Sequence, residues 1–234
     1  MHLTSRRPRP LARAAVRGWL YDRLVSGLTA GWYREVLRRL PERAHVLDVG
    51  IGTGGAVARC ADLVRAKDLR ITGVDIDPDY IHRCRQGVAR AGLDDRVTPW
   101  LASVYDHRGG PYDAVYFSAS LMLLPDPVAA ITWVSGQLAP GGRLFFTQTF
   151  EHRRSVLAEK IKPMIHHVTT IHFGRVTYED DFRRVLDEAG VDLVELAVLP
   201  GTRSAGGTRQ RSYWLAVGRV QDGERRDDGA DRAA

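Results

Sequence analysis

The chain has 234 residues, of which 44% are hydrophobic and 26% are charged, and its net charge is +6. This length suits one domain with a full α/β core, and the composition excludes a disordered or fibrous protein. The two cysteines, Cys60 and Cys84, form neither a disulfide framework nor a metal-binding Cys motif. We therefore expect a reducing, cytoplasmic location.

The N-terminus is strongly basic, with five arginines and no acidic residue between positions 6 and 17. Such a segment can contact anionic lipid or nucleic acid, although a solvated arm or helix face is the commoner role. Two of the arginines interrupt the apolar run that an export signal requires, and no stretch of 18 apolar residues could span a membrane. We expect a disordered arm at 1–10, a single domain at 11–220 and a disordered tail at 221–234.

A helical cap is predicted at residues 11–40, because apolar side chains recur there at every fourth position. The recurring residues are Val16, Leu20, Leu24, Leu28 and Trp32. Gly27 and Gly31 are expected to divide this helix into two pieces, since glycine destabilises a helix interior.

Strands and helices then alternate along the chain. Short apolar runs predict strands at 45–49, 70–75, 97–102, 112–118, 143–149, 191–199 and 212–220. Helical patterns lie between them at 56–66, 78–91, 127–138 and 179–189. This alternation is typical of βαβ units, so we predict an α/β fold with a doubly wound, mostly parallel seven-stranded sheet. Its ligand site is expected beyond the carboxyl ends of the strands.

A glycine cluster follows the first predicted strand. Gly50, Gly52 and Gly54 fit a GxGxG pattern, whereas Gly55 in place of Gly54 completes the GxGxxG pattern of dinucleotide-binding proteins. Glycines between a strand and a helix let the backbone approach a ligand closely. The glycines alone leave both cofactor classes open.

Two carboxylates near these glycines narrow the choice. A dinucleotide would place a doubly negative pyrophosphate beside Asp48, which would repel it. S-adenosylmethionine (AdoMet) carries an ammonium and a sulfonium but no phosphate, so the same carboxylate would favour its binding. Asp75, at the end of the second strand, can bind the ribose hydroxyls of either cofactor and supports nucleoside binding without discriminating.

Four segments together resemble the class I, Rossmann-like AdoMet-dependent methyltransferases, in particular those that act on small molecules. They are VLDVGIGTGG (46–55), GVDIDPDYI (73–81), YDAVYFSASLMLLPDP (112–127) and LAPGGRLFFTQT (138–149). The resemblance covers about residues 40–150, and the last two strands match the family's antiparallel seventh strand. It implies AdoMet as methyl donor and an O or N nucleophile of a small molecule as acceptor.

The resemblance also implies roles for the matching residues. Asp48 and the backbone of the three GxGxG glycines would hold the methionine end of AdoMet. Asp75 would bind the ribose hydroxyls, and Ile76 would pack on the adenine ring. Ser118, at the end of the fourth strand, would lie beside the methionine moiety.

One position departs from the family pattern. Many relatives carry an acid after the third strand that binds the adenine amino group, but Ser103, followed by Val104, stands here. A hydroxyl oxygen accepts that hydrogen bond more weakly than a carboxylate, and Asp106 is the alternative acceptor. Tyr21 in the helical cap matches the place where relatives often carry a lid tyrosine, although core packing would also explain it.

Residues 151–177 form the expected substrate-side insert and hold four of the eight histidines. A nucleophile that loses a proton benefits from a base, and Glu151, His152 and His167 are the candidates. A histidine in a loop is nevertheless more often packed or solvated than catalytic. No acidic residue stands at ligand spacing from these histidines, so no metal is expected.

Several alternatives stay open at this level. The chain could act on a membrane lipid or quinone, with its Arg-rich N-terminus in peripheral contact with the membrane. It could bind AdoMet without turnover, or it could be an NAD(P)-dependent oxidoreductase, which Asp48 disfavours. The Asn/Asp-Pro-Pro-aromatic tetrapeptide of nucleic-acid N-methyltransferases is absent at 118–121, so no nucleic-acid partner is expected. The sequence specifies neither the acceptor nor the oligomeric state.

Overall fold

The computed structural model describes residues 29–151, 178–199 and 211–221. Several predicted features lie outside these ranges: the arm 1–10, the tail beyond 221, the cap before residue 29, Tyr21, His152 and His167.

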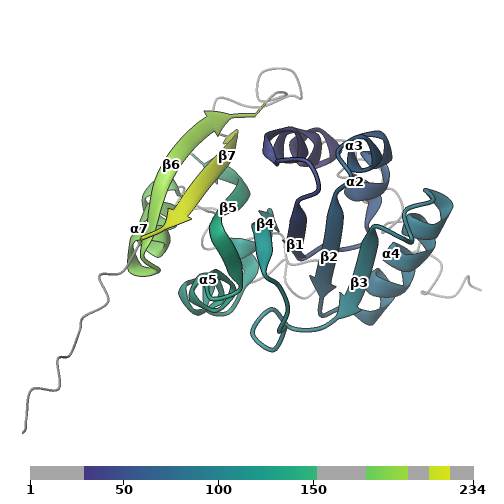
Figure 1. The fold of residues 1–234 in the computed structure, drawn as a ribbon. Helices are drawn as coiled ribbons and strands as arrows, with labels where there is room; N and C mark the ends of the chain where they lie inside the picture. Colours follow the sequence, from purple (N-terminus) through teal and green to yellow (C-terminus); the bar gives the residue numbers. More distant parts are fainter. Residues whose placement is uncertain (1–28, 152–177, 200–210, 222–234) are drawn as a thin grey trace, which may run out of the picture.

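A seven-stranded sheet in the order β3-β2-β1-β4-β5-β7-β6 forms the centre of the molecule (Figure 1). Its strands are β1 (His45–Val49), β2 (Arg70–Asp75), β3 (Val97–Leu101), β4 (Tyr112–Ser118), β5 (Leu138–Glu151), β6 (Val191–Val198) and β7 (Arg211–Val220). The pairs among β1 to β5 are parallel, and β7 runs antiparallel to both β5 and β6. The predicted α/β fold with a mostly parallel seven-stranded sheet is confirmed.

Helices cover both faces of this sheet (Figure 1). On one face lie the helix at residues 29–39, α2 (Gly55–Ala58), α3 (Ala61–Ala66) and α4 (Pro78–Arg90). On the other face lie η1 (Leu121–Leu123), α5 (Pro127–Ser135) and α7 (Glu179–Glu188). Each face has its own buried apolar cluster, with Val36 and Val88 in the first and Ile131 and Phe182 in the second. No helix in the described part of the chain is long and apolar enough to cross a membrane.

The start of α4 follows from local sequence. Asp77 caps this helix by accepting hydrogen bonds from the N–H groups of Asp79 and Tyr80 at 2.8 and 3.2 Å, and Pro78 occupies the first turn. The chain leaves the helix at Gly92, whose φ is 62°. These signals fix the β2–α4 connection, which adjoins the glycine turn.

The helices before and after β1 differ from the prediction in two ways. The helix at 29–39 continues through Gly31, because the burial of the adjacent Trp32 and Tyr33 outweighs a glycine penalty of about 1 kcal/mol. The predicted helix at 56–66 is instead two short helices. They separate at Cys60, which leaves helical geometry, is buried, and directs its Sγ to the Ala30 carbonyl at 3.5 Å.

The start of β5 also differs. The predicted helix at 127–138 ends at Ser135, and β5 begins at Leu138 rather than at Arg143. The predicted Pro-Gly-Gly turn is therefore the irregular first part of this strand. Its pairing with β4 shifts register between Tyr112 and Ala114, which accommodates the extra residues.

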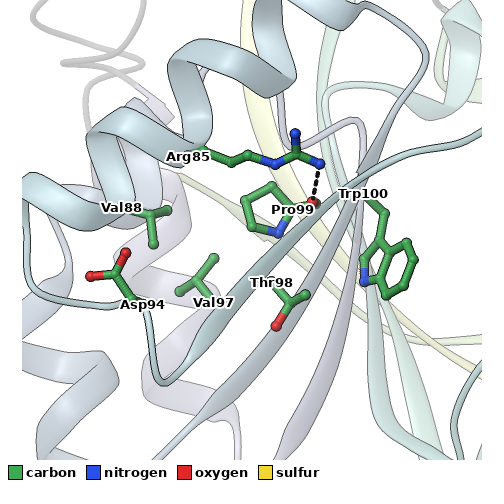
Figure 2. A pocket seen from close by; sticks show the side chains of 7 residues that line it. All are labelled: Arg85, Val88, Asp94, Val97, Thr98, Pro99 and Trp100. Carbon is green, nitrogen blue, oxygen red and sulfur yellow. Dashed lines mark hydrogen bonds between the residues drawn. The ribbon is translucent and has the colours of Figure 1, made fainter.

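β3 is one edge of the sheet, and a shallow groove that includes Trp100 separates it from α4 (Figure 2). The central residue of the strand, Pro99, has no N–H to donate. Arg85 reaches over from α4 and donates to the Pro99 carbonyl at 3.4 Å, as Figure 2 shows. The Val97 N–H donates to the Leu93 carbonyl at 2.9 Å. A proline is tolerated at an edge because no ladder hydrogen bond is lost.

Candidate functional site

The turn between β1 and α2 depends on three glycines in the left-handed region. The φ angles of Gly50, Gly52 and Gly54 are 81°, 59° and 70°. Side chains with a Cβ rarely adopt this conformation, so the glycine spacing is required by the backbone. The N–H groups of Gly50 and Ile51 both donate to the Val74 carbonyl, at 2.8 and 3.2 Å, and hold the turn against β2.

The three glycines differ in what surrounds them. A Cβ on Gly54 would lie 2.5 Å from the Sγ of Cys84 in α4, and a Cβ on Gly50 would lie 2.8 Å from the Cβ of Ser120. A Cβ on Gly52 would meet nothing within 4 Å. Gly50 and Gly54 therefore let the turn pack against the protein, whereas Gly52 leaves its backbone open to a ligand.

Asp75 joins the open glycine to the next turn. Its Oδ2 accepts a hydrogen bond from the Gly52 N–H at 3.0 Å, and its Oδ1 accepts one from the Asp77 N–H at 2.9 Å. Burial raises the pKa of this half-buried carboxyl. The adjacent Ile76 is 76% exposed, an unusual position for a large apolar side chain that suits contact with an apolar ring.

Asp48 lies within the sheet, between Gly73 of β2 and Tyr116 of β4, and is only 1% exposed. Its Oδ2 accepts a hydrogen bond from the Tyr33 hydroxyl at 2.8 Å, whereas its Oδ1 has no partner among the described residues. Burial raises the pKa of this carboxyl to about 7. A buried carboxylate oxygen without a donor is unfavourable, so a cationic or hydrogen-bond-donating group beside Oδ1 would stabilise the ionised carboxylate.

Two tyrosines pack beside this carboxylate. The rings of Tyr33 and Tyr116 meet edge to face, with centroids 5.2 Å apart, and the Tyr116 hydroxyl is 2.9 Å from the Thr147 Oγ1 in β5. Burial raises the pKa of both phenols, so both stay protonated at neutral pH. Asp48 is thus flanked on this side by two uncharged phenols, of which Tyr33 donates a hydrogen bond to it.

The remaining cofactor candidates occupy the ends of β3 and β4. Ser103 lies just beyond β3, where its Oγ accepts a hydrogen bond from the Tyr105 N–H at 3.3 Å. The side chain of Val104 is buried in the apolar cluster of the opposite face, so only its backbone could face a ligand. Asp106 donates its N–H to the Ser103 carbonyl at 3.1 Å, and Ser118 is the half-buried last residue of β4.

Two residues at this site were not predicted from the sequence. The Ser120 Oγ donates to the Val49 carbonyl and lies directly beneath Gly50, and the preceding Ala119 has a φ of 55°. Tyr33 precedes β1 by twelve residues, and no local pattern indicates that its hydroxyl reaches Asp48. A serine or tyrosine near a glycine turn is too common to identify alone.

The candidate bases are only partly within the described residues. Glu151 is the last residue of β5, at the same carboxyl edge as the glycine turn, but only its backbone is described. His152 and His167 lie outside the described residues. Within the described ranges, no group of three or more His, Cys, Asp or Glu side chains could hold a metal ion.

Comparisons with known proteins place this geometry in context. Residues 46–142 match a family model described as a methyltransferase domain. The S-adenosyl-L-methionine-dependent Diels-Alderase iliD of Neonectria sp. (strain DH2) is 28% identical, with 75% of this chain and 67% of that protein aligned. Methyltransferase GfsG of Streptomyces halstedii is 27% identical over 69% of this chain and 58% of that protein. This chain therefore spans about 60% to two thirds of the length of these two relatives.

A solved structure shares the fold. The crystal structure of the 4+2 cyclase SpnF superposes with a TM-score of 0.64 at 17% identity, over 81% of each chain. The family match runs from β1 into β5 and therefore contains Asp48, the glycine turn and Asp75.

Proposed function

We propose that the chain is a class I AdoMet-dependent methyltransferase, which binds AdoMet at the carboxyl edge of β1 and β2 and methylates a small molecule. One observation carries the proposal. The unpartnered Oδ1 of Asp48 and the open backbone of Gly52 adjoin one turn, beside the Asp75 carboxylate. These groups suit an ammonium, a close backbone contact and a ribose, respectively.

The chain's own residues would bind the cofactor from end to end. Asp48 would hold the ammonium of the methionine moiety beside Gly50, Gly52 and Gly54, and Asp75 would bind the ribose hydroxyls. The exposed Ile76 would contact the adenine ring, and Ser103 and the Val104 backbone would face its edge. Ser118 would lie near the methionine moiety, and Tyr21 would close the site. When bound, AdoMet supplies a methyl group already activated on a sulfonium.

The protein would contribute to the reaction chiefly by positioning the acceptor against the methyl group. An activated methyl group needs the acceptor lone pair held in line with it, which converts a bimolecular encounter into an oriented one. An O or N nucleophile that must lose a proton would use a base from the end of β5, where Glu151 ends the strand and His152 follows. His167 is the further candidate within the insert.

Calorimetry with AdoMet tests the cofactor proposal. We expect AdoMet to bind, NADH not to bind, and Asp48→Ala to weaken AdoMet binding at least tenfold, since a charged hydrogen bond contributes about 1.5–3 kcal/mol. Absence of AdoMet binding, or binding unchanged in Asp48→Ala, would overturn it. Methyl-labelled AdoMet incubated with a metabolite extract, followed by mass spectrometry, would then identify the labelled acceptor.

A second candidate function is an AdoMet-dependent cyclisation in which no methyl group is transferred. The 28% identity to a protein named a Diels-Alderase, over 75% of this chain, favours it. The two functions differ in their products. Methyl transfer yields S-adenosylhomocysteine and a product 14 Da heavier, whereas cyclisation leaves AdoMet intact and the substrate mass unchanged.

We propose a cytoplasmic protein whose partner is this small-molecule substrate. A peripheral membrane contact through the Arg-rich residues 6–17 would extend the acceptor to lipids or quinones. Flotation with anionic liposomes tests it: recovery of the protein in the lipid fraction would support the contact, and its failure with the N-terminus intact would exclude it.

A further inference from the structure

Resting on the proposed function, we propose that Tyr33 is a positioning residue, whose hydroxyl occupies Oδ2 of Asp48 and thereby reserves Oδ1 for the ammonium group of AdoMet. The hydroxyl donates to Oδ2 at 2.8 Å, and Tyr33 and Asp48 are 2% and 1% exposed. Oδ1 has no partner in the described structure. One oxygen of the carboxylate is therefore committed to the protein and the other is left to accept a ligand donor.

The helix at 29–39, which carries Tyr33, is held in place by its neighbours. Tyr33 lies in the helix at 29–39, where the preceding Trp32 packs on Tyr213 of β7 with ring centroids 5.0 Å apart. The following Arg34 forms two hydrogen bonds of 2.8 Å with the carboxylate of Asp62 in α3. Contacts to two different elements hold this helix on both sides of Tyr33. Burial of the Tyr33 side chain and its edge-to-face contact with Tyr116 then restrain the hydroxyl beside Asp48.

The hydrogen bond from Tyr33 also affects how much of the Asp48 carboxyl is ionised. Besides Tyr33, the titratable groups that interact with Asp48 are Asp75 of β2, Tyr116 of β4 and Cys84 of α4. Burial raises the Asp48 pKa to about 7, the Tyr33 hydrogen bond opposes that rise, and the charge of Asp75 adds to it. The donor therefore keeps part of the carboxyl population ionised at neutral pH, which is the form that binds an ammonium.

This arrangement predicts pH-dependent cofactor binding. Binding of an ammonium favours ionised Asp48, so the affinity for AdoMet should increase with pH up to about pH 7. It should fall again above about pH 8, where the α-amino group of AdoMet itself loses its proton. Below about pH 7 each pH unit should reduce the affinity by up to about tenfold. Removal of the Tyr33 hydroxyl should raise the Asp48 pKa and move this profile to higher pH.

The test compares Tyr33→Phe with the parent protein by calorimetry between pH 6 and 8.5. The two ligands are AdoMet and 5′-methylthioadenosine, which shares the nucleoside but lacks the amino-acid end. We expect Tyr33→Phe to bind AdoMet about tenfold more weakly than the parent at pH 7 and to differ much less from the parent at pH 8.5, because deprotonation of the ligand affects both proteins equally. Tyr33→Phe should bind 5′-methylthioadenosine as the parent does. Equal weakening of both ligands, or an unshifted pH profile, would overturn the proposal.

Tyr116→Phe is the matched control, because it removes a buried phenol that contacts Thr147 rather than a carboxylate. It should leave the pH profile of AdoMet binding in place. Asp48→Asn keeps the proposal testable if Tyr33→Phe does not fold: AdoMet binding should become weak and independent of pH below about pH 7. If the affinity of Asp48→Asn still fell between about pH 7 and pH 6, the role of Tyr33 would be overturned, whereas a parent protein that binds no AdoMet would overturn the proposed function itself.

Discussion

The carboxylates of Asp48 and Asp75 lie near the ends of adjacent parallel strands, but the protein surrounds them in opposite ways. Both oxygens of Asp75 accept hydrogen bonds from backbone N–H groups, at 3.0 Å and 2.9 Å, and the side chain is only half buried. Asp48 is almost fully buried and has a single donor, Tyr33. Asp75 therefore stabilises the turn that we propose binds the nucleoside, whereas Asp48 lowers stability and would be compensated by a ligand donor.

The largest effect is expected at the turn between the two carboxylates. Gly54→Ala should lower the free energy of unfolding by about 3 kcal/mol, because it combines a left-handed backbone with a Cβ 2.5 Å from Cys84 Sγ. Gly52→Ala has the same backbone requirement but open space, so about 1 kcal/mol is expected. Urea unfolding measures both, and equal losses would show that packing against α4 contributes nothing.

Asp75→Asn tests the structural carboxylate. The amide keeps one acceptor but presents an NH₂ to the other N–H, so one of the bonds to Gly52 and Asp77 is lost. We expect about 2 kcal/mol of destabilisation even without cofactor, the usual range for a hydrogen bond to a charged group. Thermal unfolding of the ligand-free protein would show it, and an unchanged melting temperature would contradict the structural role of Asp75.

Asp48→Asn, unlike Asp75→Asn, should increase the free energy of unfolding. The folded-state pKa of about 7 lies above the ordinary value of 3.8, so the folded state binds this proton more tightly. The stability contributed by the group therefore falls as pH rises between about 4 and 7, and the penalty is complete above pH 7. The neutral amide removes the penalty but leaves an imperfectly paired polar group, for a net gain of about 1 kcal/mol at pH 8.

The control for Asp48→Asn is the same comparison with the parent at pH 5. At pH 5 the parent carboxyl is already protonated, so the gain from Asp48→Asn should disappear. Melting temperatures at pH 5 and pH 8 measure the difference. A variant that is less stable than the parent at pH 8 would show that the Asp48 carboxylate contributes to folding as Asp75 does.

The smallest effect is expected at Ile76. Because this side chain is 76% exposed, Ile76→Ser should leave the free energy of unfolding unchanged within about 0.5 kcal/mol. It should weaken AdoMet about fivefold, since loss of contact with an apolar ring removes about 1 kcal/mol. Val194→Ser, at a 56% exposed valine on β6, is the control and should change neither quantity. Unaltered AdoMet affinity in Ile76→Ser would remove Ile76 from the site.

Local signals in the sequence predicted most of the fold. The strands β1, β2 and β4 have the predicted bounds because each is a short apolar run between turn residues, and Asp77 and Pro78 marked the start of α4. The errors came from contacts between distant segments. Cys60 leaves helical geometry where its side chain meets the 29–39 helix, and the register shift beside Tyr112 carries β5 through a Pro-Gly-Gly sequence that favours a turn.

The site was predictable to the same extent. The glycine spacing indicated a turn whose backbone a ligand can approach closely, and Gly50, Gly52 and Gly54 adopt positive φ angles in that turn. The order of the strands then brought Asp48 and Asp75 to one edge. The hydrogen bond from Tyr33 was not predictable, because it depends on how a helix crosses the sheet rather than on any pattern along the chain. The roles assigned to the site residues, and to Glu151, His152 and His167 in particular, stay predictions.

The edge strand β3 has a consequence for how the chain behaves when crowded or partly unfolded. A free strand edge normally offers a repeating row of donors and acceptors on which another polypeptide can extend into a fibre. Pro99 removes the central donor of this row, Arg85 occupies the carbonyl of the same residue, and Leu93 takes the Val97 N–H. The edge is thus interrupted at successive outward-facing positions, so strand-by-strand aggregation from this side of the sheet has no continuous template.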